Sequence, residues 1–248
     1  MDDLTIWLSL TLGGLVAGVI NTLAGGGSLI TVPLLVLAGL PATVANGTNR
    51  IGVLFQNLVA IWRFRQQGLD GLRGARPILA PVLTGSVVGA LIASSLPADL
   101  FRQLFGLAMI ALLFPMLRSR PTSNPQPARP PRAAWANTAL FFAIGLYGGA
   151  IQAGVGLFLI AALARSGLDL VRANAIKVVL IGALTVVAVP VFIAQRQVDP
   201  AFALALVVGF AAGGEIGARV AVAGGERVIK PMLVLAVLAM SGRMLGLY

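Results

Sequence analysis

Glycines, amide side chains and a cation are concentrated in one polar stretch, residues 21–50, which lies between two long apolar runs. Within it, the glycine run Gly25–Gly27 directly precedes Ser28 and a short apolar segment at 28–40. The first N–H groups of a helix have no partner inside the helix and carry a partial positive charge, which suits an anion. The spacing therefore predicts an anion-binding site and no catalytic residue.

A wider set of residues can donate hydrogen bonds and lies beside a glycine run or in the first turns of the next predicted helix. We predict substrate binding by Gly25, Gly26, Gly27, Ser28, Asn46, Thr48, Asn49 and Arg50, and in the second half of the chain by Gln152, Gly154, Asn174 and Lys177. Further candidates of the same kind are Asn21, Thr31, Gln56, Asn57 and Gly156.

Two interpretations compete for these residues. A cation buried in a membrane is costly and usually functional, so Arg50 and Lys177 suggest a cationic centre for an anion. Both lie near a predicted helix start, so the alternative is that their side chains extend to the membrane surface. For the glycines the alternative is close helix packing, which also explains the small-xxx-small pairs Gly85/Gly89 and Gly213/Gly217.

The residue types give little support for functions other than anion binding. Glu215 is the only carboxylate inside an apolar run; it could carry a coupling proton, or pair with Arg219 four residues later. The chain has no cysteine and no histidine, so we predict no thiol chemistry, cofactor or metal site. The GGGS run lacks the lysine and the spacing of a phosphate-binding P-loop, and no Ser/His/Asp set or carboxylate pair indicates a hydrolase.

The composition indicates an integral membrane protein. Of the 248 residues, 58% are hydrophobic and 10% are charged, whereas about 25% of residues are charged in a soluble domain. The net charge of +10 comes from arginines at the ends of apolar runs, where they are topology signals and no evidence for nucleic acid. The start, Met1-Asp2-Asp3, has no basic region, so we expect the first apolar run to be retained.

The apolar runs predict an all-α membrane protein with about five helical elements in each of two halves. We expect them at 4–23, 28–40, 44–63, 76–97 and 100–117, and at 134–152, 156–166, 171–194, 201–223 and 228–247. The halves, 1–117 and 133–248, are joined by a linker at 118–132 that contains five prolines and four arginines.

The two halves match at one constant offset, 128 positions, which predicts an internal duplication. The matches that apolar composition does not explain are glycines and one Asn pair: Gly26/Gly154, Gly39/Gly167, Asn46/Asn174, Gly85/Gly213 and Gly89/Gly217. In each half, the first two elements are short or interrupted around a glycine-rich loop. Such segments are where secondary transporters bind their substrates.

Arginine placement predicts the orientation of the halves. The region 63–76 and the linker are rich in arginine, so the positive-inside rule places both in the cytoplasm. Five crossings per half then give inverted halves with a periplasmic N-terminus. The alternative of four full spans per half gives parallel halves, but it exports the loop with Arg165 and Arg172 and the loop with Arg227 and Lys230.

Three features together resemble the TauE/SafE family of sulfite exporters: GGGS followed by L-I-x-V-P-L-L, a glycine-containing turn, and A-N-G-T-N-R entering the next helix. The resemblance covers nearly the whole chain and implies transport of sulfite, sulfoacetate or a related sulfur oxyanion across the bacterial inner membrane, commonly as efflux. By motif position it implies binding by 25–28 and 45–50. The second half departs from the motif, with Ala153-Gly154-Val155-Gly156 and Asn174-Ala175-Ile176-Lys177 at the matching places.

We therefore expect a secondary transporter that exports a small oxyanion by alternating access between its halves. The alternatives are an anion uptake carrier, a channel for another substrate, a membrane-embedded enzyme and a purely structural scaffold. The expected partners are the anion, the lipid bilayer and a coupling proton, with no nucleic acid; a homo-oligomer is left open.

Overall fold

The computed structural model describes residues 3–118 and 133–223, all of its regular structure helical. The all-helical prediction is therefore confirmed. The described helices are α1 (Asp3–Ala24), α2 (Ser28–Leu37), α3 (Ala42–Gln66), α4 (Gly71–Ser94), α5 (Ala98–Arg118), α6 (Ala134–Ala150), α7 (Val155–Ala164), α8 (Leu170–Ala194) and α9 (Pro200–Val222). The linker from 119 onward and the predicted element at 228–247 lie outside the described residues.

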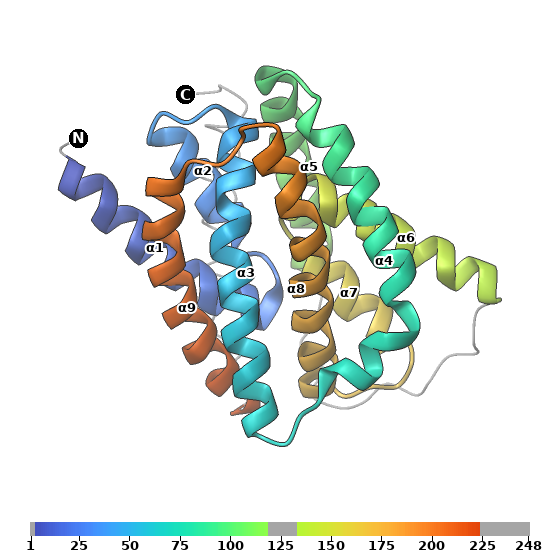
Figure 1. Cartoon of the computed structure of the whole chain (residues 1–248). Coiled ribbons are helices and arrows are strands. Elements are labelled where there is room, and N and C mark those ends of the chain that lie inside the picture. Colours follow the sequence, from blue (N-terminus) through green and yellow to red (C-terminus); the bar gives the residue numbers. More distant parts are fainter. Residues whose placement is uncertain (1–2, 119–132, 224–248) are drawn as a thin grey trace.

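Two long helices, α3 and α8, stand side by side in the middle of the bundle and run in opposite directions (Figure 1). In the view of Figure 1, α3 descends and α8 ascends. On one side α9 packs against both α3 and α1; on the other side α4 packs against both α8 and α6. The helices thus follow the order α1, α9, α3, α8, α4, α6 across the molecule.

The first two helices of each half form hairpins that enter the bundle and turn back. Both α2 and α7 have ten residues, about 15 Å of helix, against a hydrocarbon core of about 30 Å. The N-terminal end of α1 and the C-terminal end of α2 lie at the upper end of the molecule, and α7 ends at the lower end (Figure 1). The short elements expected at 28–40 and 156–166 are present as ten-residue helices, each too short to cross the hydrocarbon core by itself.

Glycines allow the outer helix pairs to approach closely. A Cβ atom at Gly85 would overlap the carbonyl oxygen of Phe142 in α6, and one at Gly213 would overlap that of Leu15 in α1. The predicted packing role of the small-xxx-small pairs is therefore confirmed. It joins α4 to α6 and α9 to α1, so that a helix of one half packs on a helix of the other.

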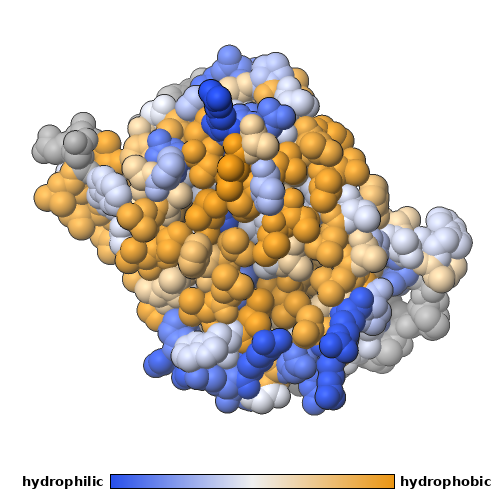
Figure 2. All heavy atoms as spheres, in the orientation of Figure 1, coloured by the Kyte–Doolittle hydropathy of each residue, from blue (hydrophilic) through white to orange (hydrophobic). Residues whose placement is uncertain are grey.

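The surface is that of a membrane protein. Figure 2 shows hydrophobic residues over the middle of the visible face and hydrophilic residues at its upper and lower ends. Within the described part of the chain, four helices are long and apolar enough to span a bilayer: Leu4–Ala24, Gly71–Ser94, Leu170–Ala194 and Pro200–Val222. The equally long α3 is much less apolar than α8 because it carries the polar stretch.

Arginines are concentrated at the lower end. The helix ends that meet there carry Arg63 and Arg65 of α3, Arg73 of α4, Arg172 of α8 and Arg219 of α9. The helix bounds differ slightly from those expected: α3 continues to Gln66 and α4 begins at Gly71, so Arg76 lies on a helix and not in a loop. An aspartate at 70 caps the start of α4 with its side chain, which moves that start upstream of the apolar run.

Local backbone geometry recurs at the offset that relates the two halves. The N–H of Leu69 donates to Phe64 O at 2.9 Å, and that of Gln197 donates to Phe192 O at 2.8 Å. Positive φ angles recur at Gly39 and Gly167, and at Gly68 and Arg196. Arg196 is one of few residues with a side chain that adopts a left-handed conformation here, and its counterpart is a glycine. These recurrences support the predicted duplication, which stays a prediction.

Candidate functional site

The polar face of α3 is buried in the centre of the molecule. Its polar side chains are wholly inaccessible to solvent and lie within about three turns of the helix: Asn46, Thr48, Asn49, Arg50, Gln56 and Asn57. A polar helix face so deep in an apolar bundle needs partners, because an unpaired polar group there costs several kcal/mol. Those partners come from both hairpins.

Arg50 caps the C-terminal end of α6. Its guanidinium donates to the carbonyl oxygens of Gly148 (3.1 Å), Gly149 (2.6 Å) and Ala150 (3.1 Å), and lies 4.5 Å above the ring of Phe192. Asn46, one turn earlier on α3, donates to Ala150 O at 3.0 Å. The partial negative charge of a helix C-terminus favours such a cation. With 0% exposure, Arg50 does not extend to the membrane surface, so the alternative interpretation is wrong for it.

Lys177 makes the matching contact in the other half. Its Nζ donates to Thr22 O at 2.6 Å and Asn21 O at 3.2 Å, at the C-terminal end of α1, and to Asn174 Oδ1 at 2.7 Å. Lys177 is also 0% exposed. The carbonyls of residues 21 and 22 correspond, at the offset between the halves, to those of 149 and 150. Each half therefore contributes a cation that caps the same place in the other half.

The start of α2 lies against α3 and presents N–H groups. Asn49 donates to Ser28 Oγ at 2.8 Å and accepts a hydrogen bond from Thr31 Oγ1 at 2.5 Å. The N–H of Gly25 is used within its own turn, where it donates to Asn21 O at 2.9 Å. Within the described part of the chain, the N–H groups of residues 26–28 have no hydrogen-bond partner. They are the donors that the glycine run predicts.

The tips of the two hairpins touch. A Cβ atom at Gly25 would overlap the backbone of Gly156, and one at Gly156 would also lie 3.1 Å from Lys177 Cδ. Gly154, at the N-terminal end of α7, has a φ of +72°, which favours glycine. The structure therefore brings the predicted residues of both halves into one region, with the hairpin tips closed against each other.

Two predicted residues make other contacts. Thr48 accepts a hydrogen bond from the Asp199 N–H at 2.9 Å, in the turn between α8 and α9. Gln152, with a φ of +63°, donates to Thr185 Oγ1 at 2.8 Å, while its own Oε1 is buried without a partner among the described residues.

Within the described part of the chain, Glu215 forms no hydrogen bond with the buried polar residues of α3 and instead pairs with arginines. Its side chain is 24% exposed, accepts hydrogen bonds from Arg219, one of them at 2.8 Å from Nε, and lies 3.5 Å from Arg63 Nε. The predicted pairing with Arg219 is thus formed, and a second arginine joins it. Both arginines contact Oε1, whereas Oε2 is buried without a hydrogen-bond partner among the described residues.

Several groups that contact the candidate residues could not be predicted from the sequence. The acceptors of Arg50 and Lys177 are backbone carbonyls, which no residue type reveals. Thr22 was not predicted, although it accepts a hydrogen bond from Gln56 Nε2 at 2.7 Å; Gln56 also accepts one from Asn21 at 2.5 Å. A hydroxyl residue next to the candidate Asn21 was the only available signal.

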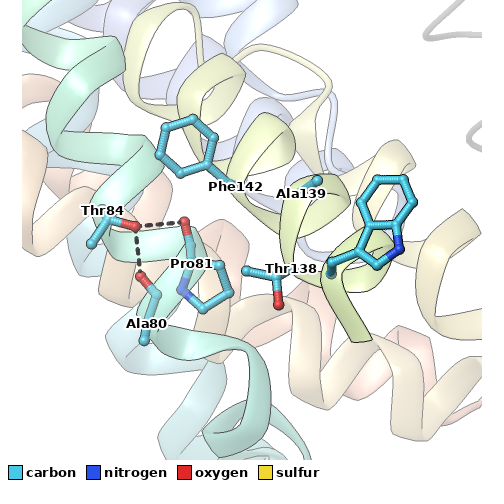
Figure 3. Close-up of a pocket in the computed structure, with 7 residues that line it drawn as sticks. Ala80, Pro81, Thr84, Thr138, Ala139 and Phe142 are labelled. Atoms are coloured by element: carbon cyan, nitrogen blue, oxygen red, sulfur yellow. Dashed lines mark hydrogen bonds between the residues drawn. The ribbon is translucent and has the colours of Figure 1, made fainter. Parts of the chain in front are cut away.

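A hollow on the outer surface lies apart from this region. It lies between α4 and α6 and is lined by Ala80, Pro81, Thr84, Trp135, Thr138, Ala139 and Phe142 (Figure 3). The Thr84 hydroxyl donates to the carbonyls of Ala80 and Pro81, so its donor is already used. None of the predicted binding residues lines this hollow.

The buried region can attract an anion. Arg50 forms no ion pair with a described carboxylate, and its Nε is buried without a partner among the described residues. The N–H groups at the start of α2 add partial positive charge. Among the described residues, no three His, Cys, Asp or Glu side chains lie together as a metal site requires.

Comparison with known proteins gives a consistent result. The model of the family "Sulfite exporter TauE/SafE" matches residues 10–244. A probable membrane transporter protein, ORF9, from a Sinorhizobium species is 30% identical over 99% of this chain and 95% of its own length. The probable membrane transporter protein YfcA of Escherichia coli K12 is 28% identical over 93% of this chain and 86% of its own. A probable membrane transporter protein of Haemophilus influenzae is 26% identical over 93% and 91%. No solved structure matches the chain.

Proposed function

The chain belongs to the TauE/SafE sulfite exporter family of membrane transporters, and from this membership we propose that it exports a small sulfur-containing oxyanion, such as sulfite or a sulfonate, across the bacterial inner membrane. It does so as a secondary transporter, by alternating access between its two halves. The proposed substrate site comprises the start of α2, residues 46–50 of α3, and Gln152, Gly154, Asn174 and Lys177 of the second half.

The observation that carries the proposal is the state of Arg50. A wholly buried guanidinium that forms no ion pair with a described carboxylate is held by three carbonyls and an aromatic ring. Its Nε, without a partner among the described residues, is the donor left for a ligand. The Nε–H can donate one charge-assisted hydrogen bond to an oxyanion, and a parallel pair of bonds forms only when an Nη group exchanges its helix carbonyl for the anion.

The reciprocal caps support a mechanism in which the halves move together. Each cation lies on a long central helix and holds the hairpin of the other half, as Arg50 does with α6 and Lys177 with α1. An oxyanion that enters competes with the helix carbonyls for the same donors. Binding therefore loosens the contact between the halves, which is what exchange between two access states requires.

The charge distribution supports one orientation. Arginines gather at the lower end in Figure 1, so the positive-inside rule makes that end cytoplasmic and puts the start of α1 in the periplasm. The export direction follows the family description.

Glu215 is the proposed coupling carboxylate. Its Oε2 has no hydrogen-bond partner among the described residues, so this oxygen is the place for a transported proton. The two arginines that contact Oε1 hold the carboxylate in position. The test of this role is given in the Discussion.

Sulfite flux into proteoliposomes tests the proposal. We expect saturable uptake of labelled sulfite that unlabelled sulfite and sulfoacetate inhibit and chloride does not. Arg50→Lys keeps the charge but loses the planar fork, so it should lower this flux by about tenfold, the effect of about 1.4 kcal/mol. The matched control is Arg102→Lys, an exposed arginine on α5.

Three outcomes of the flux experiment would contradict parts of the proposal. Absence of sulfite and sulfonate flux from folded, reconstituted protein would refute the substrate class. Conductance that does not saturate would indicate a channel. Equal flux through Arg50→Lys and the parent protein would remove Arg50 from the binding site.

A further inference from the structure

Two short turns at opposite ends of the molecule pack onto the central helices, next to the candidate binding residues. The upper turn, 195–199, joins α8 to α9 and packs on α3; the lower turn, 67–70, joins α3 to α4, and the start of α4 packs on α8 (Figure 1). We propose that these turns are the outer and inner gates of the transport pathway, an inference that rests on the proposed function.

The upper turn is attached to α3 by backbone contact and by hydrogen bonds. A Cβ atom at Gly47 would overlap the carbonyl oxygen of Gln197, so only glycine lets this turn approach so closely. The N–H of Asp199 donates to Thr48 Oγ1 at 2.9 Å. Gln197 Nε2 donates to Ser94 O at 2.8 Å, at the end of α4. The turn, which connects α8 to α9, thus contacts both α3 and α4 at the upper end.

At the lower end, Leu69 of the turn packs against the apolar cluster that contains Ala175 and Val178 of α8, and the start of α4 makes the close backbone contact. A Cβ atom at Gly71 would overlap the carbonyl oxygen of Ala175 and lie 2.9 Å from the Ile176 nitrogen. One turn later, a Cβ atom at Gly74 would lie 2.8 Å from Ile176 Cγ1. Positions 175 and 176 match 47 and 48 at the offset between the halves, so the same two positions of the central helix are covered in each half.

The covered positions adjoin the candidate binding residues. Gly47 and Thr48 lie between Asn46 and Arg50 on α3. Ala175 and Ile176 lie between Asn174 and Lys177 on α8 in the same way. Each turn therefore lies directly beside an amide–cation pair, at the end of the molecule from which that pair would be reached. Both turns are packed down in this structure.

These contacts differ from ordinary helix packing. The glycines at 85 and 89 of α4 and at 213 of α9 join helices side by side. At 47 a glycine of the central helix α3 receives the upper turn, and at 71 the glycine that begins α4, directly after the lower turn, meets the first turns of α8. The upper turn can lift without a helix leaving the bundle, whereas the lower turn lifts together with the first turn of α4, and each movement uncovers the amide–cation pair at its own end.

The chain lacks cysteine, so a single introduced thiol can report access from each side. Ser28→Cys places it at the start of α2, 2% exposed and between the two gates. A membrane-impermeant maleimide is then applied to right-side-out or inside-out vesicles. Gly47→Ala and Gly71→Ala each add a methyl group that should push the upper and the lower turn, respectively, away from the central helix. We call them the wedge variants. Gly182→Ala on α8 is the matched control, because its new Cβ would meet no atom closer than 3.5 Å.

We expect Gly47→Ala to raise labelling from the outside alone, and Gly71→Ala from the inside alone, each by about tenfold, while Gly182→Ala changes neither. Labelling from the wrong side, from both sides, or unchanged labelling in folded wedge variants would overturn the gate assignment. The readout needs no substrate, so it remains informative if sulfite flux is absent and the proposed function fails.

If the wedge variants do not fold, two less disruptive substitutions test the same gate assignment. Thr48→Val removes the acceptor for Asp199 N–H, and Ile176→Ala removes the side chain that lies against Gly74. The two positions are equivalent in the two halves. We expect smaller increases from the outside and from the inside respectively. Equal labelling of both variants and the parent from both sides would refute the gates.

Discussion

Arg50→Ala should strongly destabilise the protein. The carbonyls of Gly148 and Gly149 lose the side-chain donor that the structure gives them, whereas Ala150 keeps Asn46. A buried acceptor left unsatisfied costs about 1–3 kcal/mol, so the two carbonyls together cost about 2–6 kcal/mol. The lost contact with the Phe192 ring adds about 0.5–2 kcal/mol. We expect a loss of about 3–8 kcal/mol in the free energy of unfolding.

Arg50→Lys separates the capping of the carbonyls by a cation from the shape of the arginine side chain. Lys177 shows that a lysine can cap two carbonyls at a helix end of this protein. Arg50→Lys should therefore lose only about 1–3 kcal/mol of the free energy of unfolding relative to the parent protein. Reversible unfolding of purified protein in mixed micelles, titrated with denaturing detergent, measures both values. Arg102→Ala, on an exposed face of α5, is the control.

The capping argument would be wrong if Arg50→Ala lost no more stability than Arg102→Ala. It would also be wrong if alanine and lysine at position 50 were equally unstable, because the loss would then come from the shape of the side chain and not from the three carbonyls.

Two further predictions concern the hairpin tips and the carboxylate on α9. Gly25→Ala should lower the thermal midpoint far more than Gly182→Ala, because its Cβ overlaps the backbone of Gly156 and its φ of +79° disfavours a side chain; similar midpoints would show that the tips are not in contact. Glu215→Gln should change stability by less than about 1 kcal/mol, as for partly exposed ion pairs, and abolish the dependence of flux on a pH gradient, since the amide cannot take a proton at Oε2. A dependence that persists would leave Glu215 only its pairing with the arginines.

Much of the architecture could be predicted from the chain because it depends on local patterns. Apolar runs indicate membrane helices wherever they occur, and the helix bounds agree with the structure to within about five residues at the described ends. The ten-residue α2 and α7 follow from the interruption of the apolar runs by glycine. The candidate residues of the two halves also came from local spacing, and the structure brings most of them into one buried region.

How many times each half crosses the membrane was harder to predict, because it depends on the path of the short helices. Five crossings and a returning hairpin followed by three crossings both place the two ends of a half on opposite sides. Charge counting cannot separate them, since it registers only which side a loop is on. The position of Gly25 against Gly156 shows that the turns after α1 and α6 meet inside the bundle, and that contact joins residues from different halves.

The sequence by itself determined the membrane class, the short interrupted helices, the constant offset between the halves and the polar positions on α3 and α8. Only the tertiary structure decided what those positions hold: Arg50 caps α6, Lys177 caps α1, and Thr48 holds a turn of the other half. The reason is physical. Hydropathy and helix periodicity act over a few residues, whereas these partners lie about 100 to 156 positions apart and are mostly backbone atoms, which every residue type carries alike.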